Sequence, residues 1–156
     1  MDQRILDIMH GVIIMAAKSE VSVKWTGEKQ FLGTDSTNHS VVLSAQDAEN
    51  GTGVKPSDML LLALGSCSGV DVISILTKQR KQVTGFEMRI TGEQDAASWP
   101  RPFRKIHVEC TLKGEGLTEK GVARAMELSH EKYCSVGSTI AGVAEVTYSY
   151  QLIHEG

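Results

Sequence analysis

The sequence predicts an α+β protein in which antiparallel strands accompany one long, buried helix. Three observations favour this class: short alternating segments near the N-terminus, a long apolar segment over Pro56–Lys81, and further alternating segments on both sides of a second helical pattern. The predicted strands cluster and do not alternate strictly with helices, which is typical of α+β proteins. The chain has 156 residues, enough for one domain with its own hydrophobic core.

Residues 1–19 are expected to form an N-terminal extension, and residues 20–156 the folded domain. The longest apolar run of the extension, Val12–Ala17, is far shorter than the roughly 20 residues of a transmembrane helix. Acidic residues and a His10-Gly11 interruption are also untypical of a signal peptide. Its apolar residues recur at helical spacing, so we expect a short amphipathic helix there.

The folded domain is expected to begin with three strands in an antiparallel meander. Val21–Trp25 alternates apolar and polar side chains, and Gln30–Gly33 and His39–Leu43 follow it. Turn-forming residues separate the three segments, with Gly27 in the first connection.

The segment Pro56–Lys81 predicts the central helix. Proline suits the first turn of a helix, and Asp58 complements the positive end of its dipole. Met59–Leu64 is apolar on every side, which indicates a helix at the centre of the protein. Gly65 and Gly69 weaken helix propensity, and inside a buried helix they indicate close approach by another backbone.

The remainder of the chain predicts two strands, a helix and a closing strand. The strands are Phe86–Gly92 and Ile106–Leu112, and both alternate. Thr118–Lys132 has an amphipathic pattern with Thr118 as its N-cap. Val143–Ile153 is the last strand, which gives the order β-β-β-α-β-β-α-β.

Charge and cysteine content limit the function classes. The net charge is −3, so the chain lacks the basic excess that neutralises phosphates, and we expect no nucleic-acid or membrane partner. Three cysteines are too few for a disulfide framework and favour a reducing, cytoplasmic location. We find no GxSxG, phosphate-binding loop or GxGxxG motif, and we expect no cofactor.

The residues alone favour a packing role for each cysteine. Cys67 lies in the middle of the predicted central helix, where the helix dipole does little to favour a thiolate, and Asp71 one turn later would raise its pKa. Two His/Cys pairs, at positions 107/110 and 130/134, lack the third and fourth ligands of a zinc site, so we expect no metal.

Two stretches together resemble the OsmC/Ohr family, the osmotically inducible and organic hydroperoxide resistance proteins, and in particular its YhfA-like branch. They are Pro56–Leu76, PSDMLLLALGSCSGVDVISIL, and Glu131–Val136, EKYCSV. The resemblance covers residues 20–154. It implies an α+β fold that exists as an intertwined homodimer, with two active sites at the subunit interface.

The resemblance also implies a chemistry. The cysteine on the central helix, Cys67, would attack a hydroperoxide and become a sulfenic acid, and Cys134 would resolve this acid to a disulfide. A dithiol reductant, whose identity the sequence does not give, would restore the enzyme, which would serve in defence against oxidative stress. Such an arrangement suits a sulfenic acid, which escapes overoxidation by condensing with a nearby thiol. Cys110 has no family role and is expected to pack in the core.

One part of the family pattern is missing. Family peroxidases stabilise the thiolate with an arginine on an early strand, held by a glutamate after the helix proline. Here the early stretch has no arginine, Lys29 is the only nearby base, and Ser57 takes the glutamate position. Asp58 is the acidic candidate for that role. Two alternatives therefore stay open: a different thiol chemistry in the same pocket, and a non-enzymatic dimer that binds small apolar ligands.

Overall fold

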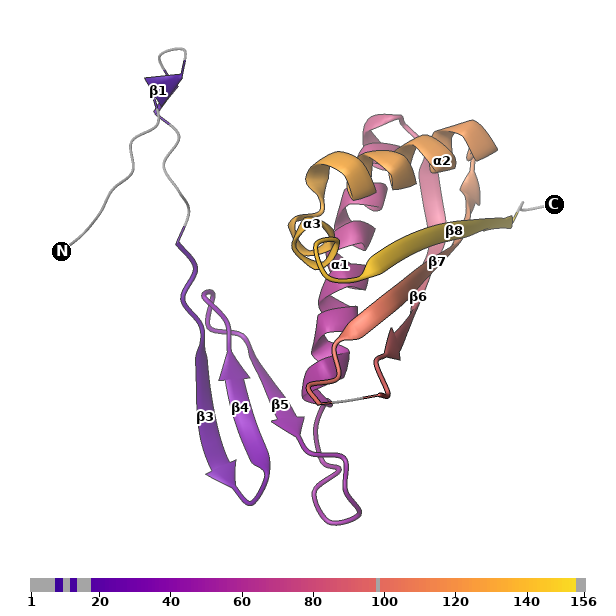
Figure 1. Cartoon of the computed structure of the whole chain (residues 1–156). Helices are drawn as coiled ribbons and strands as arrows, with labels where there is room; N and C mark the ends of the chain where they lie inside the picture. The colour runs from indigo at the N-terminus through magenta and orange to yellow at the C-terminus, as the bar shows by residue number, and fades with distance from the viewer. Residues whose placement is uncertain (1–7, 10–11, 14–17, 98, 154–156) are drawn as a thin grey trace. The chain divides into compact units, whose positions relative to one another are not determined.

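A computed structural model confirms the α+β class and divides the chain into two compact units (Figure 1). One unit covers residues 1–56 and the other residues 57–156. The structure describes residues 8–9, 12–13, 18–97 and 99–153.

The described part of the N-terminal extension is extended. β1 (Ile8–Met9) and β2 (Val12–Ile13) pair antiparallel, where the spacing of apolar residues favours a helix. The β-branched residues Ile8, Val12 and Ile13 have lower helix propensity and fit a strand well. The rest of residues 1–17 lies outside the described residues.

The first unit contains the expected three-stranded meander. β3 (Ser22–Gly27), β4 (Gln30–Thr34) and β5 (Ser40–Ser44) pair antiparallel in sequence order. The turn between β3 and β4 has positive φ at Gly27 and Glu28, and a register shift marks the end of β3. Ser44, fully buried, accepts hydrogen bonds from the amides of Thr52 and Gly53 and thereby fixes the loop that follows β5.

The second unit contains another three-stranded sheet, in the order β6-β7-β8. β6 (Gln82–Gln94) and β7 (Phe103–Glu115) form a long antiparallel pair, whereas β8 (Glu145–Ile153) runs parallel to β7. This parallel pair corrects the expectation of antiparallel strands throughout. The chain leaves β7 and passes through helices before it returns, and such a crossover is what a parallel pair requires.

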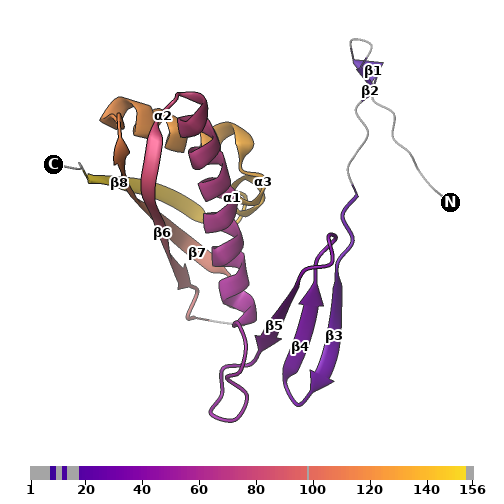
Figure 2. The same ribbon diagram turned by 180° about the vertical axis from the view of Figure 1, so that it is seen from behind.

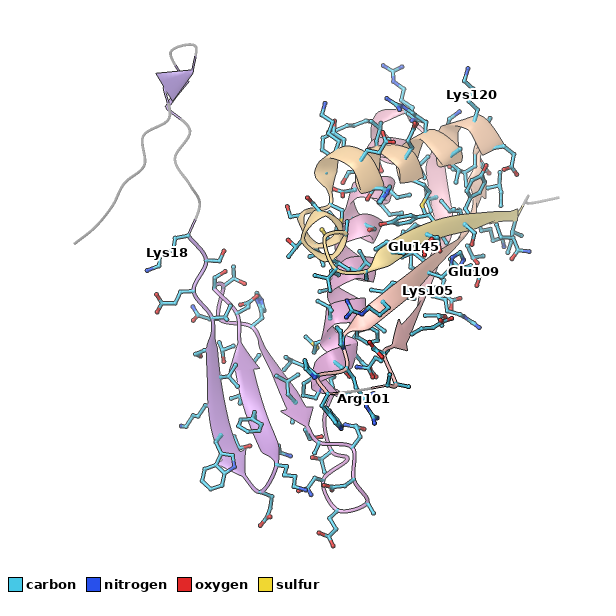
Figure 3. The ribbon with its side chains drawn as sticks, in the orientation of Figure 1. Lys18, Arg101, Lys105, Glu109, Lys120 and Glu145 are labelled. Atoms are coloured by element: carbon cyan, nitrogen blue, oxygen red, sulfur yellow. The ribbon has the colours of Figure 1, made fainter. Side chains whose placement is uncertain are left out.

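Three helices pack on one face of this sheet. α1 (Pro56–Lys78) lies across it, and α2 (Glu119–Leu128) and α3 (Ser135–Ile140) adjoin α1 (Figures 1 and 2). Alternate residues of β7, from Ile106 to Leu112, enter the core between sheet and helices. On the opposite face His107 and Glu109 are exposed, as is Lys105 just before this stretch, and Figure 3 labels the Lys105 and Glu109 side chains. One face of the sheet is therefore apolar and the other charged, as the alternation predicts.

Helix α1 ends three residues earlier than expected. Arg80 has a positive φ of 58°, and the Lys81 amide donates to the Leu76 carbonyl. This backbone arrangement caps the last carbonyls of the helix with a left-handed residue, a position that glycine usually takes.

Helix α1 is only half buried within the chain, although its apolar pattern indicates a helix surrounded on all sides. Leu64, Val72 and Leu76 are fully buried, but Leu62 is 53% exposed and Val70 is 67% exposed. By length and composition the helix is apolar enough to cross a membrane, with a mean hydropathy of 2.0. A core helix has the same composition, and the buried side of α1 packs as one.

The exposed side of α1 borders an apolar groove of about 570 Å³, shared with β6. Gly65 and Gly69 are among the residues that line this groove. Glycine is required at these positions because a Cβ atom would meet the side chain of Ile90 at Gly65 and of Phe86 at Gly69. The glycines therefore admit side chains of β6, whereas the sequence indicated approach by a backbone. They bring the sheet close to the helix and leave the groove open beside Leu62 and Val70.

Truncation of the core between α1 and the sheet is expected to destabilise the protein. Leu76 is fully buried in the cluster that joins α1, β7 and α2. Leu76→Ala should lower the free energy of unfolding by about 2–5 kcal/mol, through lost burial and the cavity left behind. Val143→Ala, at a side chain 60% exposed, should change it by less than about 0.5 kcal/mol. Urea denaturation at one protein concentration measures both, and equal losses would contradict this packing.

Candidate functional site: two thiols and a carboxylate

The second unit brings two cysteines and an aspartate together. One ligand atom each from Cys67, Asp71 and Cys134 lies within 4.8 Å of the other two. Both cysteines are free thiols. Cys67 and Asp71 are one turn apart on α1 and so share a face of the helix. Cys134 is 2% exposed and packs with Leu64 of α1 in the core.

A change of helix type positions Cys134. After α2, residues Ser129–Tyr133 form a π-helical turn, and the Cys134 amide donates to the Ser129 carbonyl at 2.9 Å. Cys134 itself is extended and caps the N-terminus of α3. Because the helix does not continue through residue 134, the thiol turns toward α1. π-helical turns are uncommon and occur frequently at functional sites.

Hydrogen bonds hold both side chains that face Cys67. The Gly137 amide donates to Cys134 Sγ at 3.2 Å, and the Ser68 hydroxyl donates to the same sulfur at 3.4 Å. The Ser129 hydroxyl donates to Asp71 Oδ2 at 3.1 Å. The sulfur and the carboxylate are therefore oriented before anything binds, which is typical of a reactive or ligand-binding site.

The surroundings of Cys67 disfavour its thiolate within a single chain. Burial raises its pKa, while a hydrogen bond from the Val136 backbone lowers it. The neighbouring Cys134 thiol and the Asp71 charge also raise the pKa of Cys67. The balance leaves the thiol pKa above its ordinary value, which confirms the expected direction of the Asp71 effect. A fast nucleophile at neutral pH would need an additional positive charge at this position.

Removal of the Asp71 charge is expected to activate Cys67. Asp71→Asn removes a negative charge near the sulfur, so the thiolate fraction at pH 7 rises. The less basic thiolate is also a weaker nucleophile, which offsets part of the gain from the larger thiolate fraction. The net rate of alkylation by iodoacetamide should increase about two- to threefold. Asp58→Asn is the matched control, because it removes an acid from the same helix. An unchanged or slower rate in Asp71→Asn would contradict the electrostatic account of this site.

The other residues named from the sequence are Asp58 and Lys29. Asp58 is nine residues before Cys67, roughly 13 Å along the helix axis, and its contacts include a hydrogen bond from Ser57. Lys29 is in the first unit and pairs with Asp47 at 2.8 Å. That hydrogen bond, together with hydrogen bonds from Asn50, lowers the pKa of Asp47 to about 2. The structure therefore brings Cys67 and Cys134 together, and not Asp58.

Cys110 is separate from the site. It is fully buried in the cluster of α1, β7 and α2, and burial raises its pKa to about 12. Its burial and high pKa are typical of an inert packing residue, which is the role expected for a cysteine without a family role.

Three further residues lie at the site, and sequence reasoning missed two of them, Ser68 and Tyr148, while it considered His130 only as a metal ligand. Ser68 adjoins Cys67 in the chain but contacts Cys134. The Tyr148 hydroxyl on β8 is buried beside Ser68, without a hydrogen-bond partner among the described residues, and burial raises the pKa of Tyr148 to about 12. The His130 ring lies 4.5 Å from the Tyr148 ring, and its Nδ1 is likewise buried and unpartnered in the described part of the chain. Only the tertiary fold brings Tyr148 to the thiols.

Comparison with known proteins places this geometry in a family. The family model described as OsmC-like protein matches residues 46–149. The chain is 34% identical over 134 residues to protein YhfA of Escherichia coli strain K12, and the match covers 86% of this chain and 98% of that protein.

Solved structures extend the comparison to the fold. A hypothetical protein from Aquifex aeolicus is 28% identical, with a TM-score of 0.80 over 90% of this chain and all of that one. The organic hydroperoxide resistance protein OhrB of Bacillus subtilis is 14% identical, with a TM-score of 0.60 over 86% of this chain and 98% of that one. At this identity the second likeness concerns the fold alone.

Proposed function

The chain belongs to the OsmC-like protein family, and on this premise we propose that it is a cysteine-based peroxidase that reduces organic hydroperoxides. The observation that carries the proposal is the meeting of Cys67 and Cys134, 67 positions apart in sequence, as two free thiols in one cluster. Family structures with hydroperoxide resistance in their names share the fold.

The proposed reaction uses one sulfur for attack and the other for resolution. The Cys67 thiolate attacks the terminal oxygen of the hydroperoxide, the O–O bond breaks, and the alkoxide leaves as the alcohol after it takes a proton. Cys67 is now a sulfenic acid. The Cys134 sulfur displaces its hydroxyl, which leaves as water with the Cys134 proton, and a disulfide forms. A dithiol then exchanges with this disulfide and returns both thiols.

The site is suited to the second of these steps. Cys134 is held by the Gly137 amide and the Ser68 hydroxyl, so it lies ready for the sulfenic acid of Cys67. The Tyr148 hydroxyl, buried and unpartnered in the described structure, is a donor available to an oxygen atom at this site. Its pKa near 12 keeps it protonated at neutral pH.

Activation of Cys67 is assigned to a second copy of the chain. Within one chain the pKa of Cys67 is raised, so the proposed first step needs a positive charge from outside. We propose a homodimer in which the second copy covers the exposed side of α1. Leu62 and Val70 expose apolar surface there, and the exposed Ser66 between them is small enough for close approach of another chain.

Turnover in a coupled assay tests the proposal. Protein in its homodimeric, untagged form is mixed with cumene hydroperoxide and a dithiol such as dihydrolipoamide, and peroxide loss is followed. We expect turnover above the rate of the dithiol alone. Monothiol reductants should support it less well, because the disulfide is internal. A cytoplasmic setting, in which dithiols stay reduced, completes the proposal. A rate of peroxide loss equal to that of the dithiol alone would contradict the proposed peroxidase activity.

The raised pKa of Cys67 favours a second candidate, a dimer that binds small apolar ligands without thiol chemistry. The rate at which Cys67 of the homodimer is alkylated distinguishes the peroxidase from the ligand-binding dimer. A peroxidase should show fast alkylation of Cys67 at pH 7, whereas the binder should react no faster than a free thiol of pKa about 8.5. A different electrophile or sulfur species as substrate would leave a mass adduct on Cys67 with no cumene hydroperoxide turnover.

A further inference from the structure

We propose that Cys67, Asp71 and Cys134 form a zinc-binding site in the reduced protein. The three residues offer two sulfurs and a carboxylate oxygen, all within 4.8 Å of one another. Sulfur and carboxylate ligands of this kind suit Zn²⁺. The site is not one of the His/Cys pairs that the sequence suggests, and it does not depend on peroxide turnover.

The geometry requires only a small contraction. In a tetrahedral zinc site with bond lengths of about 2.3 Å to sulfur and about 2.1 Å to oxygen, neighbouring ligand atoms are about 3.6–3.8 Å apart. The ligand atoms now lie at most 4.8 Å apart, so movements of about 1 Å bring them to the tetrahedral spacing. Side-chain rotation allows movements of this size. The fourth position is left for water or a small ligand, as in open zinc sites.

The backbone arrangement favours joint coordination. Cys67 and Asp71 stand at positions i and i+4 of α1, the spacing at which two ligands of a helix meet one metal ion. Cys134 comes from a separate element, the start of α3, and approaches the same face. Ligands from a long helix and from a fixed cap make a site whose shape is largely set before the metal binds.

The outer contacts are those of a supported site. Ser129 donates to Asp71, and Gly137 and Ser68 donate to Cys134. Such partners orient ligands toward the metal. The two thiolates and the Asp71 carboxylate also bring negative charge together at one place. A divalent cation compensates that charge directly.

Zinc and the disulfide would compete for the same sulfurs. A bound ion occupies Cys67 and Cys134 as thiolates, so neither is available to attack a peroxide, and the oxidised pair has no thiolate to offer the metal. Zinc should therefore bind to the reduced chain alone and protect its thiols from oxidation.

Cobalt and zinc titrations of the reduced, untagged protein test this site. Co²⁺ reports the ligands through thiolate charge-transfer absorption in the near ultraviolet, and Zn²⁺ should displace it. The variants are Cys67→Ser, Cys134→Ser and Asp71→Asn, with Cys110→Ala as the matched control for a cysteine outside the site. Circular dichroism shows whether each variant is folded, and the disulfide form of the wild-type chain supplies a second test without any substitution.

We expect one ion per chain, charge-transfer bands that both cysteine variants lose, and affinity at least about tenfold weaker in Asp71→Asn. Cys110→Ala should bind as the wild type does. The proposal is overturned if Zn²⁺ binds more weakly than about micromolar, if the bands persist in both Cys67→Ser and Cys134→Ser, or if the oxidised chain binds equally well.

Discussion

Cys67→Ser is expected to abolish hydroperoxide reduction, with a loss on the order of 10³-fold or more in kcat/KM. A hydroxyl cannot replace the thiolate as the nucleophile, because its pKa lies far above the working pH. Cys134→Ser should behave differently: it should react once with cumene hydroperoxide and then accumulate sulfinic acid on Cys67, since the resolving thiol is missing. Stopped-flow kinetics and intact mass spectrometry distinguish the two variants.

Cys110→Ala is the matched control for these variants. Cys110 is fully buried in the core and separate from the cluster, so its removal should leave the turnover rate within about twofold of the wild type after correction for the folded fraction. Equal turnover in Cys67→Ser and the wild type would contradict the assignment of the attacking sulfur. Rapid recycling of Cys134→Ser by a dithiol would contradict the assignment of the resolving one.

Val70→Glu is expected to separate the proposed dimer into monomers. The Val70 side chain is 67% exposed in the single chain and borders the apolar groove of α1 and β6. A glutamate buried there by a second copy would lack a partner, at a cost of several kcal/mol, so the dissociation constant should rise at least about 100-fold. Sedimentation velocity over a concentration series measures the change. Peroxidase activity should fall with the dimer fraction, because in the proposed homodimer the second copy supplies the positive charge that activates Cys67.

Val143→Glu provides the comparison for this substitution. Val143 is also apolar and 60% exposed, but it lies in the turn before β8 and outside the groove. It should leave the sedimentation coefficient and the activity unchanged. A dimer that survives Val70→Glu, or that Val143→Glu disrupts equally, would place the contact elsewhere on the chain.

The elements of the fold could be predicted from sequence because their signals are local. Alternation predicted the strands of the two three-stranded sheets but not β1 and β2. Thr118 caps α2 as expected, with its hydroxyl accepting from the Gly121 amide. The parallel pairing of β8 with β7 could not be predicted in this way, since alternation does not specify direction. The exposure of one side of α1 could not be predicted either, because an apolar helix has the same composition whether its own chain or a second chain covers it.

The site was partly predictable for a similar reason. Cys67 and Cys134 belong to motifs that resemble a family, and the structure brings them together. Asp71 is one turn from Cys67, so helical spacing alone placed it near the thiol. Tyr148 lies on the last strand and carries no local signal; only the pairing of β8 beside β7 brings it to the thiols.

The most direct test of this account is the mapping of disulfides after a single oxidation. Reduced protein is treated with one equivalent of cumene hydroperoxide, alkylated, digested and analysed by mass spectrometry without reduction. The account predicts that the peptides containing Cys67 and Cys134 appear joined within one chain, with a mass two hydrogens lower than that of the two free peptides. Cys110 should stay a free thiol that becomes alkylated only once the protein is denatured. Free Cys67 and Cys134 thiols after complete consumption of the peroxide, or a disulfide that includes Cys110, would contradict it.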